Sequence, residues 1–250
     1  MRTPRKILGV PFSVGTADQV VELAVRGGLV VVPSAPVLVE AAGNPALRQA
    51  IEGADLAVAD SGLMILLWRL LAWERLERVS GLEYLKVLLA RPELRRPGAV
   101  FWVMPTTGRR QRNLAWLTAQ GYPSGAADCY IAPIYGAGDL RDEALLAVVQ
   151  ERRPAHIIIA LGGGVQERLG YFLIKSLGES AAGYRPGIHC IGAAIGFLSG
   201  DQVRIPRWAD YLYLGWLVRC LSAPRRFVPR YWRALHLIPL MIRYREKSPV

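Results

Sequence analysis

Two kinds of hydrophobic pattern alternate along most of the chain. Short continuous apolar runs, rich in β-branched and aromatic residues, are typical of buried strands. Between them lie longer segments in which apolar positions recur every three or four residues, as in helices that pack on one side. We expect strands at 29–33, 55–60, 99–104, 128–134, 156–161 and 187–193, and helices at 16–26, 37–53, 62–73, 108–119, 140–152 and 166–177. This order predicts an α/β fold, a Rossmann-like and mostly parallel sheet with helices on both faces.

Individual residues make the prediction of three of these helices more precise. Thr16 and Gln19 have the spacing of a capping box at a helix start. The second helical segment is expected to break at Gly43 and to restart with Asn44 as its cap. Residues 62–73 are apolar nearly all round, which predicts a buried helix.

The last fifty residues have a different composition. Residues 201–250 hold ten basic against three acidic residues, and so carry +7 of the chain's net charge of +11. Eight aromatic residues are interleaved with these cations. We therefore expect two parts, a Rossmann-like domain over 1–200 and a basic, aromatic-rich helical appendage over 201–250.

The charge predicts an anionic partner, but it leaves the choice open between nucleic acid, anionic lipid and a phosphorylated substrate. The N-terminus lacks the apolar core of a signal peptide, and no uninterrupted apolar run reaches the ~18 residues of a spanning helix. We therefore expect a cytoplasmic protein that can lie on a membrane surface. The cysteines Cys129, Cys190 and Cys220 lack metal-ligand spacing and are expected to be buried free thiols.

Ligands of a parallel sheet gather where strands end and the following helices begin. Four such places carry polar residues, at 31–36, 58–62, 103–110 and 160–167. Asp60 closes one of these strands and is therefore a candidate general base. The alternative interpretation makes it the N-cap of the next helix.

The motifs that the chain lacks limit the ways in which it could bind a phosphate group. The segment GGGVQE at 162–167 fails as a dinucleotide fingerprint, because Glu167 stands where the last glycine is required. Arg109, Arg110 and Arg112, at another helix start, are candidate phosphate ligands, with a solvated surface run as the alternative. The chain has no Asp-x-Asp motif and no cluster with metal-ligand spacing. We therefore expect no metal and no cofactor, and a diphosphate would be met by arginines and backbone amides.

The order of these motifs resembles that of the WecG/TagA/CpsF family of bacterial glycosyltransferases over nearly the whole chain. The segments VPS (32–34), ERVSGLEYL (77–85), GGGVQE (162–167) and GAAIGFLSGDQVRIPRW (192–208) are each similar to a family motif in the same order. The helix and strand that lead to Asp60 look like those before the family's proposed catalytic aspartate. The tail match at 214–232 is the most specific, because five elements keep their spacing: Arg219, Pro224, Arg226, Arg230 and Tyr231.

The resemblance implies an inverting, metal-independent glycosyltransferase of cell-surface polysaccharide synthesis. It would move an N-acetylhexosamine-type sugar from a UDP donor to a polyprenyl-diphosphate-linked sugar, with Asp60 as catalytic base. The implied partners are the UDP-sugar, the lipid-linked acceptor and the anionic inner face of the cell membrane, which the appendage would contact. The candidate substrate-binding residues are Ser34, Glu83, Gly136, Gly162, Gln166, Glu167, Arg204, Arg219, Arg225, Arg226 and Arg230.

The sequence departs from the family in its ligand-facing motifs. Val32 and Ser34 replace the polar Thr and Asn of the family's turn, Ile195-Gly196 replaces its Phe-Asp, and Gly215 replaces a Glu. A different donor is therefore open, and an inactive relative acting as a scaffold or regulator in the same pathway is the alternative. A nucleic-acid-binding protein, which we do not expect, would bind any polyanion with a steep dependence on salt. Association into a homo-oligomer is left open.

Overall fold

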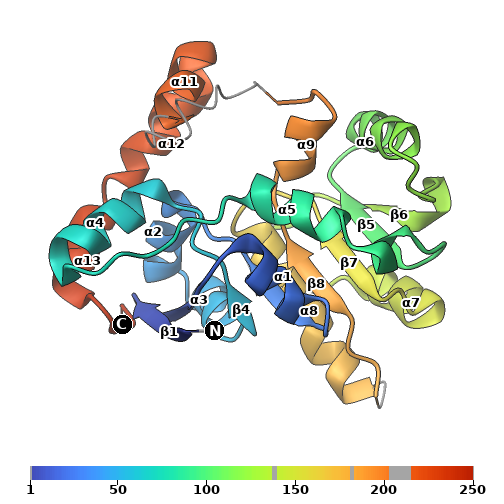
Figure 1. Cartoon of the computed structure of the whole chain (residues 1–250), viewed down its shortest axis with the longest axis horizontal. Coiled ribbons are helices and arrows are strands. Elements are labelled where there is room, and N and C mark those ends of the chain that lie inside the picture. Colours follow the sequence, from blue (N-terminus) through green and yellow to red (C-terminus); the bar gives the residue numbers. More distant parts are fainter. Residues whose placement is uncertain (1, 137–139, 181–182, 203–214, 250) are drawn as a thin grey trace.

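An eight-stranded sheet forms the centre of the computed structural model, which describes residues 2–136, 140–180, 183–202 and 215–249 (Figure 1). The strand order is β1-β2-β4-β3-β8-β7-β5-β6, and every neighbouring pair is parallel except β1 and β2. The strands are β1 (Arg2–Ile7), β2 (Val10–Val14), β3 (Gly28–Val31), β4 (Leu56–Ala57), β5 (Val100–Met104), β6 (Cys129–Ile131), β7 (His156–Ile159) and β8 (Gly187–Cys190).

Helices cover both faces of this sheet. One core lies under α1 (Ala17–Ala24), α5 (Gly81–Leu89) and α6 (Thr107–Ala119), and the other under α2 (Ala35–Gly43), α3 (Pro45–Glu52), α7 (Glu143–Arg152) and α8 (Val165–Ser180). Side chains alternate between the two cores along a strand, so that Leu29 and Val31 of β3 join one and Val30 the other. Two short 3₁₀ helices, Pro92–Arg95 and Ala126–Asp128, complete these layers. The structure confirms the α/β, Rossmann-like prediction.

Helix starts follow the predicted capping residues. Thr16 and Gln19 form the expected capping box at the start of α1. Helix α2 ends at Gly43, and the side chain of Asn44 accepts a hydrogen bond from the Leu47 amide in the first turn of α3. Local hydrogen-bonding chemistry was therefore sufficient to place these boundaries.

The N-terminal hairpin of β1 and β2 was not predicted from the sequence. In β1, the side chains from Thr3 to Lys6 are exposed, because this strand forms the edge of the sheet. An exposed edge strand lacks the apolar run that marked the central strands. A second difference concerns the thiols, since Cys190 is buried as expected but Cys129 and Cys220 are only partly so.

Helix α4 (Gly62–Ala72) corrects the prediction of a buried helix at 62–73. Met64, Ile65 and Trp68 are buried, whereas Leu66 is 42% and Leu70 is 72% exposed. Trp73, the residue directly after α4, is 91% exposed. The helix is apolar on both sides, but the fold covers only one of them.

The C-terminal helices return to the N-terminal half of the molecule. After α9 (Ala194–Leu198), the described chain resumes with α11 (Gly215–Ser222), α12 (Pro224–Ala234) and α13 (Leu237–Tyr244).

Leu237 and Met241 of α13 are buried in the core that also contains α2 and α4, and the Leu8 amide donates to the Arg245 carbonyl at 2.7 Å. The two ends of the chain are accordingly close together (Figure 1). The boundary between domain and appendage near residue 200 stays a prediction. Within the described ranges, no helix is long and apolar enough to cross a bilayer.

Candidate active site

A cleft of about 630 Å³ opens at the carboxyl ends of the parallel strands. Its walls come from the segments after β3, β4, β7 and β8, from the first turns of α5, α6 and α8, and from α12. This is the place that the parallel topology predicts for a ligand, because strand ends and helix starts meet there. Six of the predicted site residues line it: Ser34, Asp60, Gly162, Gln166, Glu167 and Arg230.

Asp60 follows β4 and lines the cleft. The side chain is 30% exposed, and its Oδ1 lies 3.6 Å from a terminal nitrogen of Arg78. Arg78 also donates from Nε to the Asp60 carbonyl at 2.9 Å. Ser61, and not Asp60, is the N-cap of α4, since its hydroxyl accepts from the Met64 amide. The N-cap interpretation of Asp60 is therefore wrong, and the residue lines the cleft beside Arg78.

The three glycines after β7 serve different purposes. A Cβ on Gly163 would lie 2.5 Å from Cγ2 of Val37, so this glycine permits close packing against α2. Gly164 has a φ of +87°, a backbone conformation that favours glycine. A Cβ on Gly162 would meet nothing within 4 Å, and this residue lines the cleft. Two of the glycines therefore shape the turn, and the first leaves room beside the cleft.

Gln166 and Glu167 lock this turn to the neighbouring strand. Glu167 is completely buried and accepts hydrogen bonds from the Gly164 amide at 2.7 Å and from Nε2 of Gln166 at 3.0 Å. Gln166 accepts in turn from the amide of Gly192, in the segment after β8, at 2.6 Å. Burial raises the pKa of Glu167, because a charged carboxylate is poorly solvated there. Both side chains border the cleft, yet their polar groups are engaged in holding it together.

The C-terminal helices contribute one wall of the cleft. Phe227 of α12 is buried against it, and Arg230 donates to the hydroxyl of Ser34 at a long distance of 3.5 Å. A segment remote in sequence thereby brings a guanidinium group to the end of β3. The tail and the sheet together make the site.

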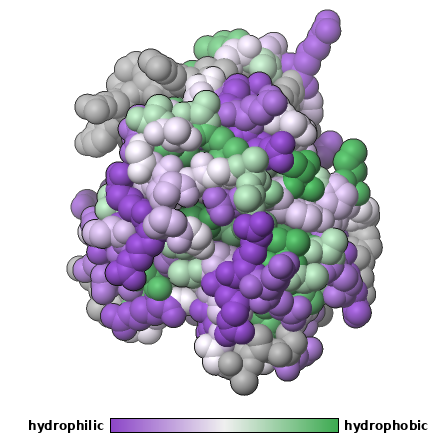
Figure 2. Space-filling model, turned by 90° about the vertical axis from the view of Figure 1, so that its right-hand side faces the viewer, coloured by the Kyte–Doolittle hydropathy of each residue, from purple (hydrophilic) through white to green (hydrophobic). Residues whose placement is uncertain are grey.

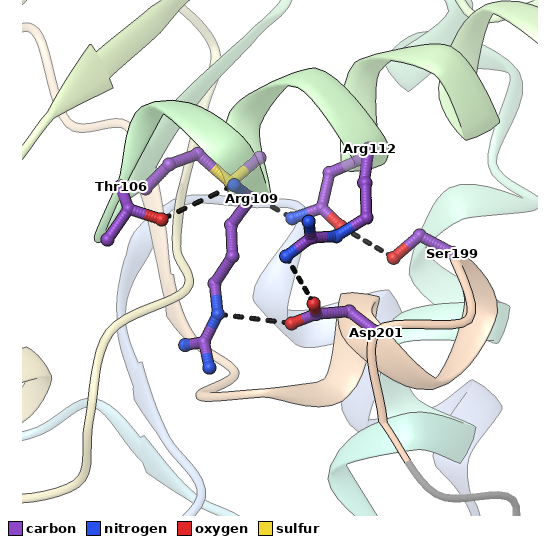
Figure 3. Close-up of polar contacts among 7 residues, drawn as sticks. Thr106, Arg109, Arg112, Ser199 and Asp201 are labelled. Atoms are coloured by element: carbon purple, nitrogen blue, oxygen red, sulfur yellow. Dashed lines mark hydrogen bonds and ion pairs between the residues drawn. The ribbon is translucent and has the colours of Figure 1, made fainter.

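On the opposite side, α6 is tied to the segment after α9 (Figure 3). Arg109 and Arg112 both pair with Asp201, at 3.0 and 2.5 Å, and the Ser199 hydroxyl donates to Oδ1 of the Asn113 side chain at 2.6 Å. Arg109 also lines the cleft, whereas Arg112 does not. For Arg109 the structure disfavours the interpretation as a solvated surface residue, and its side chain is only 34% exposed.

Other predicted site residues lie away from this cleft or outside the described residues. Glu83 is exposed in the first turn of α5, and Gly136 is exposed after β6, where its carbonyl accepts from Arg168. Arg225 is exposed on α12 and does not line the cleft. Arg204 and the side chains of Arg219 and Arg226 lie outside the described residues.

Two cleft cations were missed by the sequence analysis. Arg78 and Lys86 line the cleft beside Asp60 and the start of α5. Arg78 lies in the segment between α4 and α5, and no spacing rule links it to Asp60. Lys86 has the spacing of an ordinary exposed helical residue. Among the described residues, no group of three or more His, Cys, Asp or Glu could hold a metal ion.

The comparisons with known proteins agree with this geometry. No curated protein matches the chain. The model of the family described as glycosyl transferase WecG/TagA/CpsF matches residues 5–249, which includes the strand-end cleft and α12, which lines it. Since this match covers nearly the entire chain, the protein belongs to the WecG/TagA/CpsF family of glycosyltransferases.

Proposed function

We propose that this glycosyltransferase moves an N-acetylhexosamine-type sugar from a UDP donor to a polyprenyl-diphosphate-linked sugar, with inversion at the anomeric carbon. Its family places it in cell-surface polysaccharide synthesis. The observation that carries the proposal is the Asp60 carboxylate, which is partly exposed in the cleft and is not used as a helix cap.

Asp60 is the proposed general base. It takes the proton of the acceptor hydroxyl while that oxygen forms a bond to the donor's anomeric carbon. On the opposite side of that carbon, the bond to the UDP phosphate oxygen breaks, and UDP leaves with the bonding electrons. A single displacement of this kind inverts the anomeric centre.

The charge distribution of the cleft suits a leaving group with several negative charges. Arg78, Lys86, Arg109 and Arg230 line it, together with the acids Asp60 and Glu167. Cations held in place by the fold stabilise the charge that develops on a diphosphate in the transition state. Arg109 is held at the cleft by its ion pair with Asp201, at 3.0 Å.

A donor screen tests the proposal directly. The full chain is incubated with a polyprenyl-diphosphate sugar acceptor and a panel of UDP-sugars, and the release of UDP is measured. We expect release with at least one N-acetylhexosamine donor, and only when the acceptor is present. Asp60→Asn is the matched control, because it keeps the shape of the side chain but removes its basicity.

Two results would contradict the proposal. Transfer that is undiminished in Asp60→Asn would remove Asp60 as the base. Absence of transfer with every donor, while the folded chain still binds the lipid-linked acceptor, would instead favour a scaffold or regulator of the same pathway.

A further inference from the structure

Two arginines of α6 share one carboxylate beside the cleft. Nε of Arg109 lies 3.0 Å from Oδ2 of Asp201, and a terminal nitrogen of Arg112 lies 2.5 Å from its Oδ1 (Figure 3). The Asp201 side chain is only 14% exposed. Arg109 lines the cleft, whereas Arg112 and Asp201 do not. Asp201 therefore lies behind Arg109 and supports a cation that a ligand in the cleft can reach.

The charges of this cluster do not balance. Arg109 and Arg112 are three residues apart, so they are neighbours on one side of α6, and each takes one oxygen of Asp201. Two guanidinium groups and one carboxylate leave a net positive charge. An ion pair that served only to join two segments would need one arginine, and the excess charge at the cleft wall favours an anionic ligand.

The ion pair leaves the terminal nitrogens of Arg109 available to that ligand. A guanidinium group donates hydrogen bonds from Nε and from its two terminal nitrogens. Asp201 takes Nε, and among the described residues it is the only partner of the Arg109 side chain. The two terminal nitrogens form the fork that binds two oxygens of a phosphate group. Asp201 thus orients this fork without occupying it.

The turn after α9 holds Asp201 in place. The Ser199 hydroxyl donates to Oδ1 of buried Asn113 on α6 at 2.6 Å, and the Gln202 amide donates to the Gly196 carbonyl at 2.9 Å. A Cβ on Gly196 would lie 2.9 Å from Cγ of Gln202, so the turn packs directly on this glycine. The carboxylate is therefore anchored from both sides, by α6 and by α9.

Gly196 also explains why the carboxylate comes from position 201. This glycine stands where the family motif has an aspartate. A Cβ built on it would lie 3.5 Å from Cβ and 3.7 Å from Oδ2 of Asp201. Asp201 therefore brings a carboxylate to the space that a side chain at position 196 would enter.

The outer surface around α6 does not resemble a protein interface. The side of the molecule that carries α6 faces the viewer in Figure 2 and is mostly hydrophilic, with scattered hydrophobic residues. Stable protein interfaces have an apolar centre and a polar rim. The place of Arg109 on the cleft wall accordingly favours a small anionic ligand over a protein partner.

We propose that Asp201 is a positioning residue of the transfer reaction, which holds the Arg109 guanidinium ready to bind a diphosphate in the cleft. Neither residue is among those that the family resemblance implies. Both substrates of the proposed reaction carry a diphosphate, and the inference rests on the proposed function in taking this group as the ligand. A long side chain that is ordered before the ligand arrives costs less entropy on binding, and this is the contribution of Asp201.

Binding of UDP and of a short-chain, water-soluble prenyl diphosphate to the full chain tests the role of Arg109. Isothermal titration at about 0.15 M salt, where exposed charges more than ~8 Å apart are largely screened, gives both dissociation constants. Arg109→Gln should raise at least one of them by about tenfold or more, because hydrogen bonds to a charged group are lost. A rise for UDP assigns the arginine to the donor, and a rise for the prenyl diphosphate assigns it to the acceptor.

The role of Asp201 is tested on the same ligand. Asp201→Asn should weaken binding by about twofold to tenfold, which is the cost of ordering one long side chain. The double variant Arg109→Gln/Asp201→Asn should bind no more weakly than Arg109→Gln alone, since Asp201 acts through the arginine.

Two control variants separate this role from a purely structural one. Arg110→Gln removes a positive charge from the next position of α6, which does not line the cleft. Ser199→Ala removes a hydrogen bond between the turn and α6 but leaves both ion pairs. Each should bind both ligands within about twofold of the wild type. A loss in Ser199→Ala as large as that in Asp201→Asn would overturn the positioning role.

Unchanged binding of both ligands by Arg109→Gln would also overturn the proposal. So would tighter binding by Asp201→Asn, because the carboxylate would then only repel the diphosphate. Arg109→Gln changes a partly exposed side chain, so it decides the question even if Asp201→Asn does not fold.

These binding measurements do not require sugar transfer, so the two proposals fail separately. If Arg109→Gln weakens binding but the wild type transfers no sugar, only the proposed reaction is contradicted. If the wild type transfers sugar but Arg109→Gln binds both ligands normally, only the role of Arg109 and Asp201 is contradicted.

Discussion

The carboxyl groups of Asp60 and Glu167 both lie beside the cleft, after a strand of the parallel sheet. They differ in their exposure and in their hydrogen-bond partners. Asp60 follows β4 and Glu167 follows β7, both at the edge of the sheet where the cleft opens. Asp60 is 30% exposed and lies beside Arg78. Glu167 is fully buried, and its two oxygens accept from the Gly164 amide and the Gln166 side chain.

The difference lies in what surrounds each turn. Ser61 caps α4, so Asp60 does not serve as the cap of this helix. Glu167 lies in the first turn of α8, and its hydrogen bonds hold the glycine turn closed. A carboxylate near a strand end can thus line the cleft partly exposed, as Asp60 does, or be buried in the hydrogen bonds of a turn, as Glu167 is.

The largest effect is expected for Asp60→Asn. The amide cannot accept the acceptor's proton, so we expect sugar transfer to fall by about 10²–10⁴-fold. Stability should change little, because the side chain caps no helix and its ion pair with Arg78 is long, at 3.6 Å, and partly exposed. Initial transfer rates and a thermal melt measure the two quantities, and a parallel loss of stability would mean that Asp60 resembles Glu167 after all.

Glu167→Ala tests the other side of the comparison. It leaves two buried donors, the Gly164 amide and Nε2 of Gln166, without their acceptor, so the free energy of unfolding should fall by about 2–4 kcal/mol. Glu167→Gln keeps one acceptor oxygen and should lose less. Denaturant unfolding measures both variants. An alanine variant with full stability but no transfer would assign Glu167 to the chemistry.

A smaller effect separates the glycines of the same turn. Gly163→Ala places a Cβ 2.5 Å from Cγ2 of Val37, which should cost about 1–3 kcal/mol of stability. Gly162→Ala meets nothing within 4 Å and is the matched control, with stability expected within about 0.5 kcal/mol of the wild type. Denaturant midpoints compare the two, and equal losses would show that the turn is not packed as described.

The smallest effect is a dependence on pH. Burial raises the folded-state pKa of Glu167, so its contribution to stability is fully present below the unfolded pKa and is lost as the pH rises through the folded value. Glu167→Gln cannot ionise, and it should therefore gain on the wild type as the pH rises above about 4.5, by at most about 1.4 kcal/mol per pH unit. Unfolding free energies of both proteins across this range provide the test, and a constant difference would contradict the raised pKa.

Much of the fold was predictable because it depends on interactions between residues that are close in the sequence. Caps such as Asn44 and the apolar central strands follow from short-range rules, and they led to the central parallel strands and to most of the helices that cover them, although α5 was not predicted. The edge strand β1 and the exposed side of α4 were not predictable in this way. An edge strand lacks the apolar run, and the composition of α4 does not say which of its apolar sides the rest of the chain will cover.

The residues of the candidate site were likewise predictable only in part. Residues that follow a strand, such as Asp60 and Gly162, were found because topology places strand ends together. Arg78 and Lys86 were missed, since their approach to the cleft depends on how the segment after α4 and helix α5 pack. The contact of Arg230 with Ser34 joins distant parts of the chain, and only the family resemblance suggested that this arginine matters.

The pairing of the segment after β1 with the end of α13 has a consequence for biosynthesis. The Leu8 amide can form its hydrogen bond only after Arg245 has been synthesised. The core around α4 is likewise complete only when Leu237 and Met241 are present. At roughly 5–20 residues per second, translation separates these partners by on the order of tens of seconds. The layer of the fold that contains α4 therefore stays incomplete in the nascent chain during most of its synthesis. Contacts between residues so far apart in the sequence form late and slowly. The nascent chain can complete this layer only after nearly all of it has been made.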